Sequence, residues 1–196
     1  MPNLNMTIAD AQRDMRSGYM SGAPGMFASA TVWAIASIVA LEASANKAVF
    51  ALFFGAMLIH PLSVLLCKAF GRKGSHTKDN PLASLAMENT LWLIFSCPIA
   101  YGVSLTNIAW FFPAMLLVIA GRFFTFHTLY GIRTYWFCGG TLALAAYVLA
   151  ASNTQPYISA LAGCAIEFTF GVFILISDRR EKQSRPARNE TPGGAS

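Results

Sequence analysis

Six stretches of this chain are apolar on every side, and short polar segments separate them. They cover residues 24–41, 48–66, 81–101, 107–126, 135–151 and 157–177. A helix of a soluble domain carries a polar face, whereas a helix that is hydrophobic all round lies in a large core or a membrane. About 20 residues cross a hydrocarbon core of about 30 Å, and the stretches are near that length. The pattern predicts an all-α fold, a polytopic transmembrane helix bundle with six spans.

The segment before the first span has a different pattern. Over residues 7–19, apolar side chains recur at helical spacing at Ile8, Ala11, Met15 and Tyr19, while charged residues occupy the other side. Such a pattern predicts a short amphipathic helix, capped by Thr7, that lies flat at the membrane surface. The chain thus divides into an N-terminal segment (1–23), a six-helix membrane domain (24–177) and a disordered basic tail (178–196).

The distribution of charge adds an orientation to these spans. With six spans, every Lys and Arg except Lys47 falls on one side of the membrane. Cytoplasmic segments of membrane proteins are enriched in Lys and Arg, so this asymmetry predicts that both termini are cytoplasmic. The net charge of +5 is explained by the same rule and by anionic lipid headgroups, and it does not indicate a nucleic-acid partner.

Composition and motifs narrow the class of protein further. Only 12% of the residues are charged and 55% are hydrophobic, whereas soluble domains have about 25% charged residues. The four cysteines form no CxxC pair, and the sequence contains no GxSxG, HExxH or phosphate-binding loop. We therefore predict no metal site, no cofactor and no enzymatic activity, in a multi-pass membrane protein whose direct partner is the lipid bilayer.

Ionisable residues inside the spans are the main functional lead, because an ionised side chain at mid-membrane costs about 2.5–3.5 kcal/mol even on the lenient insertion scale. Glu167 is the deepest of them and Glu88 lies nearer the cytoplasmic boundary. Either carboxyl group is a candidate proton or cation site, and a structural buried hydrogen bond explains each equally well.

Three basic side chains complete the set of candidate site residues. His60 precedes Pro61 in the second span, where it either contacts Glu88 or binds a backbone carbonyl freed by the proline kink. Arg122 either pairs with Glu88 or extends its guanidinium to the headgroups. His127 follows Arg122 in the same polar-aromatic string, residues 121–131. The candidate transport or proton site is therefore Glu88, Glu167, His60, Arg122 and His127.

A weak internal similarity relates the two halves of the membrane domain. The string Glu88-Asn89-Thr90 in the third span resembles Glu167-Phe168-Thr169 in the sixth. Three spans in each half would have opposite orientations, which is the inverted repeat of many transporters, although apolar helices often resemble one another by chance.

Two functions remain open on these observations. The first is a small solute or ion transporter, proton-coupled through its intramembrane carboxyl groups. The alternative is a non-transporting membrane protein that binds a lipid or partner through its basic cytoplasmic face. Anionic lipid is then expected at Lys68, Arg72, Lys73 and Lys78, and a second copy of the chain is a further candidate partner, as a homo-oligomer.

Three features also resemble a known group of proteins. They are the helix at residues 13–18 that leads into Trp33, the His60-Pro61 step, and the string from Gly121 to Tyr130 after the fourth span. In these features the chain resembles a family of small, uncharacterised bacterial membrane proteins, a domain of unknown function. The resemblance implies a multi-pass protein of the bacterial inner membrane. Arg122 stands where that family favours Ala or His, and the resemblance implies no activity.

Overall fold

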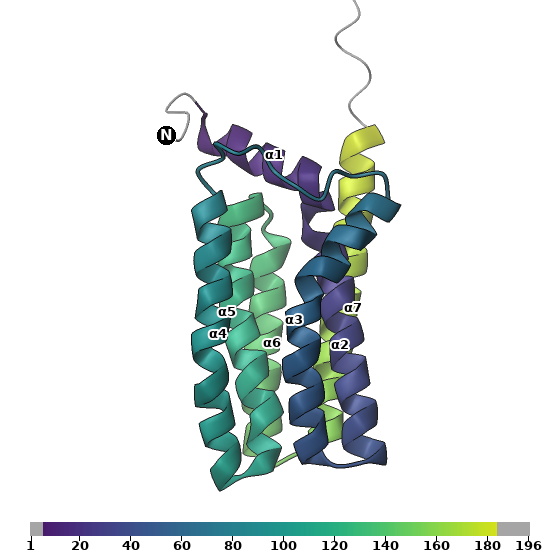
Figure 1. The fold of residues 1–196 in the computed structure, drawn as a ribbon, viewed down its shortest axis with the longest axis vertical. Helices are drawn as coiled ribbons and strands as arrows, with labels where there is room; N and C mark the ends of the chain where they lie inside the picture. The colour runs from purple at the N-terminus through teal and green to yellow at the C-terminus, as the bar shows by residue number, and fades with distance from the viewer. Residues whose placement is uncertain (1–5, 184–196) are drawn as a thin grey trace, which may run out of the picture.

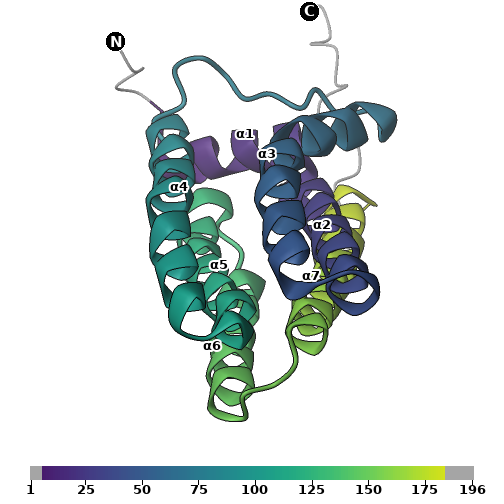
Figure 2. The same ribbon diagram turned by 60° about the horizontal axis from the view of Figure 1, so that its bottom comes forward.

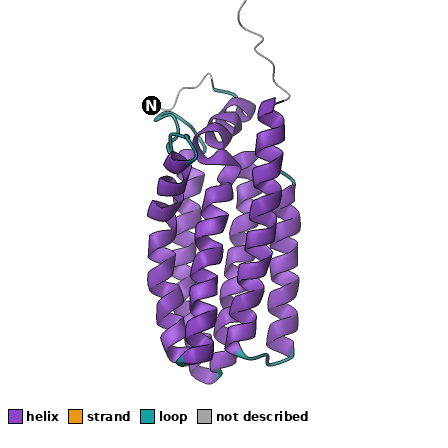
Figure 3. Cartoon of the chain, turned by 90° about the vertical axis from the view of Figure 1, so that its right-hand side faces the viewer, coloured by secondary structure: helices purple, strands orange, loops and turns teal. Residues whose placement is uncertain are grey.

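The computed structural model describes residues 6–183, and every regular element in that range is a helix (Figure 3). Six long helices stand side by side and α1 lies across one end of them (Figure 1). We call the end that carries α1 the capped end and the opposite one the far end. The elements are α1 (Ile8–Tyr19), η1 (Met20–Gly22), α2 (Ala23–Glu42), α3 (Ala45–Ala69), α4 (Ala83–Thr106), η2 (Ile108–Trp110), α5 (Phe111–Tyr130), α6 (Thr134–Ala151) and α7 (Pro156–Gln183).

The number of membrane crossings follows from length, composition and the position of the chain ends. Five segments, which contain α2, α3, α5, α6 and α7, are long and apolar enough to cross a membrane. Helix α4 is 24 residues long but less apolar, because it contains Glu88 and Asn89. The described chain starts and finishes at the capped end, which requires an even number of crossings (Figure 1). Helix α4 is therefore the sixth, and the all-α polytopic bundle is confirmed.

The six helices pack as two groups of three. In the first group α2 packs against both α3 and α7, and in the second α5 packs against both α4 and α6. The groups meet where α6 and α5 contact α7, while α3 and α4 stand apart (Figure 2). Helices α3 and α4, the second and third spans, are not packed together, because the link at residues 70–82 crosses the capped end before α4 begins. The groups are also not the sequential halves of the proposed repeat, since α7 packs with α2.

Helix α1 forms as the amphipathic pattern predicts. Thr7 caps it by accepting a 3.2 Å hydrogen bond from the Asp10 backbone N–H. Its face at Ala11, Met15 and Gly18 is buried against the protein. Side chains of α1 also bind the end of α5: the Gln12 amide donates to the Thr128 carbonyl at 2.8 Å, and Arg16 donates to the Tyr130 carbonyl. Helix α1 therefore covers the bundle as well as lying flat.

The link between α3 and α4 is fixed to α1 by one carboxylate. Asp14 accepts hydrogen bonds from both the backbone and the side chain of Thr77, each at 2.9 Å, and from the Asn80 amide at 2.8 Å. Burial alone would raise the pKa of Asp14, but these hydrogen bonds, together with the nearby His76, lower its pKa below the ordinary value.

A second polar cluster joins the link, the α1–α2 turn and α7. The Arg72 guanidinium pairs with the Asp178 carboxylate at 2.6 Å and donates to the Ser17 carbonyl at 3.1 Å. The Ser21 hydroxyl donates to the same carboxylate at 2.7 Å. Asp178 was expected to begin the disordered tail, but α7 continues through Gln183. The remainder of that predicted tail, residues 184–196, lies outside the described part of the chain.

Candidate functional site

The interface between α2 and α7 contains a completely buried carboxyl group. Glu167 of α7 is 0% exposed, and one of its oxygens, Oε1, accepts a 3.0 Å hydrogen bond from the indole N–H of Trp33 on α2. The Ser29 hydroxyl, one helical turn from Trp33, lies beside the same carboxyl group. The other oxygen, Oε2, has no hydrogen-bond partner in the described structure. Glu167 is therefore held by one donor and has capacity for another.

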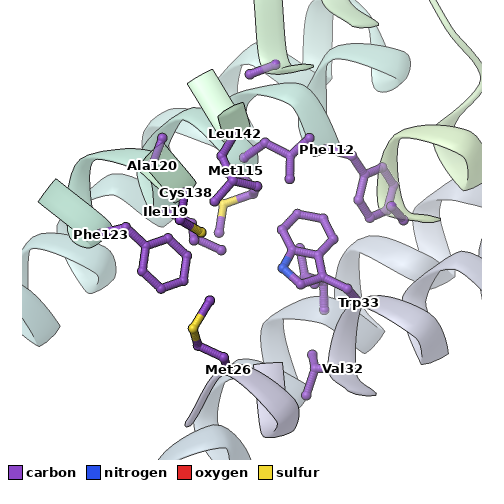
Figure 4. Packing of buried hydrophobic residues seen from close by; sticks show 14 of the residues in the cluster. Met26, Val32, Trp33, Phe112, Met115, Ile119, Ala120, Phe123, Cys138 and Leu142 are labelled. Atoms are coloured by element: carbon purple, nitrogen blue, oxygen red, sulfur yellow. The ribbon is translucent and has the colours of Figure 1, made fainter. Parts of the chain in front are cut away.

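Apolar packing fixes the indole that holds Glu167. Trp33 projects into the cluster formed by Phe112, Met115 and Leu142 (Figure 4), and its ring centroid lies 6.2 Å from that of Phe112. A glycine on α7 makes room for it: a Cβ atom added at Gly163 would lie 2.9 Å from the indole carbon Cδ2. The Trp33 donor is thus positioned by both groups of helices.

Polar residues on α2 mark this interface in the sequence. Ser29, Trp33 and Ser37 are four residues apart, which places them along one side of the helix. The Ser37 hydroxyl donates to the Tyr157 carbonyl at 2.8 Å near the far end. Sequence reasoning identified Glu167 but missed this row, although its spacing in an otherwise apolar run was a usable signal.

Arg122 lies at the same depth as Glu167. Each is eleven residues from the far-end start of its helix, Phe111 for α5 and Pro156 for α7, or about 16 Å by helical rise. The two side chains interact electrostatically. Within residues 6–183, however, Arg122 makes no ion pair within 4 Å, and its Nε atom is buried without a partner. Its Cζ atom lies 5.7 Å from the centre of the Phe126 ring.

The remaining predicted site residues are not gathered with this pair. His60 and Glu88 are exposed on the outside of α3 and α4, and these helices do not pack together. The His60–Glu88 contact, one of the two alternatives for His60, is therefore absent from the described structure. Arg122 forms no pair with Glu88 either. His127 packs its ring 6.1 Å from Trp136 of α6, and its Nδ1 atom is buried without a partner. Their proposed roles stay predictions.

A residue beside Glu88 is buried in its place. The Asn89 side chain is 5% exposed, and neither its amide nitrogen nor its oxygen has a partner in the described structure. Burial of an unpaired amide is costly, so such a group indicates a bound molecule or ordered water. The signal in the sequence is an Asn within an apolar run, next to the charged residue Glu88.

The predicted lipid-binding cluster is divided by the structure. Lys68, Lys73 and Lys78 are exposed near the capped end. Arg72 is not free for a headgroup, because its guanidinium is committed to Asp178 and Ser17. The described residues contain no cluster of three His, Cys, Asp or Glu side chains that could hold a metal ion, and the four cysteines are unbonded.

Residues 8–177 match a family of unknown function, DUF7010, and the chain belongs to that family. No curated protein and no solved structure matches it. The family assignment agrees with the resemblance drawn from the sequence and adds no activity to it.

Proposed function

We propose that this protein carries a small solute across the membrane together with a proton, and that Glu167 is the proton carrier. The burial of Glu167 carries the proposal: the carboxyl group is 0% exposed halfway along a membrane helix and has one unpartnered oxygen. An isolated ionised carboxylate is very costly in an apolar interior, so this group takes up a proton or a cation when its surroundings change.

Arg122 supports the same proposal from the other group of helices. Its positive charge is at the depth of Glu167 without contacting it. Loss of the Glu167 proton strengthens the attraction between the two side chains, which stabilises the ionised state. The attraction between Glu167 in the first group and Arg122 in the second then couples protonation to the relative position of the two groups of helices. The capped end is proposed to face the cytoplasm of a bacterial inner membrane, following the distribution of Lys and Arg.

Proton movement is measured in proteoliposomes that contain a pH-sensitive dye. A potassium gradient with valinomycin imposes the membrane potential, and the full-length protein is expected to acidify or alkalinise the lumen faster than empty liposomes. Glu167→Gln is expected to abolish this flux. Glu88→Gln is the matched control, because it removes a carboxylate from the exposed side of α4, and it is expected to keep the flux. Equal flux in Glu167→Gln and the unmodified protein refutes the proposal.

The basic face favours a second candidate function, binding of an anionic lipid. Lys68, Lys73 and Lys78 extend exposed side chains near one end of the bundle, where each cation contributes about 1 kcal/mol of attraction to an anionic membrane surface. Replacing the three by Gln is expected to reduce retention of phosphatidylglycerol by the purified protein, measured by native mass spectrometry against phosphatidylcholine. Unchanged retention contradicts this function and leaves the proton measurement unaffected.

A further inference from the structure

A hollow of about 320 Å³ lies between α3 and α4 at the far end, and these helices belong to different groups. Its walls come from the start of α3 and the end of α4 with η2. The lining residues are Asn46, Val49, Phe50, Tyr101, Ser104, Leu105 and Ile108. Most of these side chains are apolar or aromatic, and nothing in the described structure fills the space between them.

The face of α4 that lines the hollow continues toward Arg122. Cys97 precedes the lining residue Ser104 by seven residues, which is two helical turns on the same face and about 10 Å along the axis. Cys97 is half-buried and is close enough to Arg122 to interact with its charge. One face of α4 therefore carries both residues that line the hollow and a thiol that interacts with the charge of Arg122.

Arg122 indicates the charge of an occupant. Its side chain is partly exposed and its Nε atom is buried without a partner. No carboxylate lies within 4 Å of its nitrogens among residues 6–183. A cation in this state is stabilised by an anion that also accepts its hydrogen bonds, and a guanidinium suits a carboxylate or a sulfonate.

We propose that an amphipathic organic anion binds along this face of α4, with its charged group on Arg122 and its apolar chain in the hollow at the far end. The proposal rests on the proposed function, since it assigns this anion as the solute that moves with the Glu167 proton. A hollow between helices of the two groups also allows entry from the side, through the lipid, where such molecules concentrate.

The test measures binding, without a pH gradient, to full-length protein in phosphatidylcholine nanodiscs. The probes are radiolabelled decanesulfonate, whose charge is permanent, and decyltrimethylammonium, which has the same chain and the opposite charge. Saturable binding of decanesulfonate is expected, at least about tenfold tighter than that of the cation. Arg122→Gln is expected to weaken anion binding by about tenfold or more, and Arg122→Lys to retain most of it.

A second pair of variants tests the hollow without touching the interior. Asn46→Trp places a large ring into the hollow from an exposed position on α3 and is expected to reduce binding of decanesulfonate. Lys47→Trp, at the next exposed position and not part of the lining, is the matched control and is expected to bind normally. Variants are compared only when their unfolding temperatures match that of the unmodified protein.

Three results overturn the inference: no saturable binding, equal affinity for both probes, or anion binding unaffected by both Arg122→Gln and Asn46→Trp. The Glu167→Gln variant separates this result from the proposed function, because it is expected to bind the anion while losing proton flux. If the protein binds the anion but moves no protons, the anion site is supported and the transport proposal fails. If it moves protons but does not bind the anion, the transport proposal is supported and the anion site is refuted.

Discussion

Removal of one partner from the Arg72–Asp178 ion pair is expected to cost far more stability than removal of one partner from the other ion pair in the described structure, Arg13–Asp10. The Arg72 and Asp178 side chains are 12% and 8% exposed and their charged atoms lie 2.6 Å apart. The Arg13 and Asp10 side chains are 54% and 47% exposed, at 3.3 Å. Removing one partner of a buried pair costs about 3–5 kcal/mol, because it leaves an uncompensated charge, whereas an exposed pair contributes about 0–1 kcal/mol.

Each ion pair is tested with the same three variants: Arg→Met, Asp→Asn, and the double variant that combines them. In Arg72→Met the carboxylate of Asp178 keeps the hydrogen bond from Ser21, so we expect the lower end of the range, about 3 kcal/mol. In Asp178→Asn the guanidinium keeps the Ser17 carbonyl, so about 3 kcal/mol is expected here as well. The double variant should lose less than the sum, with a coupling energy on the order of 2 kcal/mol.

The assay is reversible unfolding of the purified protein in detergent micelles, followed by circular dichroism, for both double-mutant cycles. The cycle on Arg13 and Asp10 should give a coupling energy below about 0.5 kcal/mol. Additive effects of Arg72→Met and Asp178→Asn would refute the reasoning, since they would mean that the two charges do not depend on each other. Equal coupling in both cycles would show that burial is not the deciding variable.

Three further predictions follow from the capped end. Gly18→Ala should destabilise the protein, because the added Cβ atom would lie 2.2 Å from a backbone oxygen of the link. Gly140→Ala, on an open face of α6, is the control and should be neutral or stabilising by up to about 1 kcal/mol. Thermal unfolding of the two variants measures the difference. Because the pKa of Asp14 is lowered in the folded state, its carboxylate should contribute stability that is present above about pH 4 and is lost as the pH falls through the folded-state pKa. The unfolding temperature, measured from pH 7 to pH 3, should therefore fall in acid, and Asp14→Asn should reduce this fall. A reporter fused after Ser196 should be cytoplasmic and one inserted at Ser44 external, and the opposite result would reverse the orientation.

Much of the fold could be predicted from the sequence, because membrane spans are determined by local composition. The six apolar stretches became the six long helices, and the pattern at Thr7 and Asp10 gave the first helix with its cap. The neighbours of each helix could not be predicted in this way. Lipid-facing and protein-facing side chains are both apolar, so composition does not indicate that α7 packs against α2 or that α3 and α4 stand apart.

The candidate site was predicted only in part for the same reason. Glu167 and Arg122 were found because charge in an apolar stretch is conspicuous. Glu88 was equally conspicuous but faces outward, and its neighbour Asn89 is the buried residue. A shift of one position along a helix rotates a side chain by about 100°, and the sequence alone does not fix that rotation when both sides of the helix are apolar.

The hydrogen bonds of the capped end depend on correct insertion of the preceding helices into the membrane. They join residues far apart in the sequence: 114 positions separate Arg16 from Tyr130, and 157 separate Ser21 from Asp178. The hydrogen bond between Ser21 and Asp178 forms only after the last helix has been synthesised. A chain in which one helix failed to insert would place Asp178 on the other side of the membrane from Ser21. The capped end is therefore completed last during biogenesis, and a single helix that fails to cross leaves it incomplete.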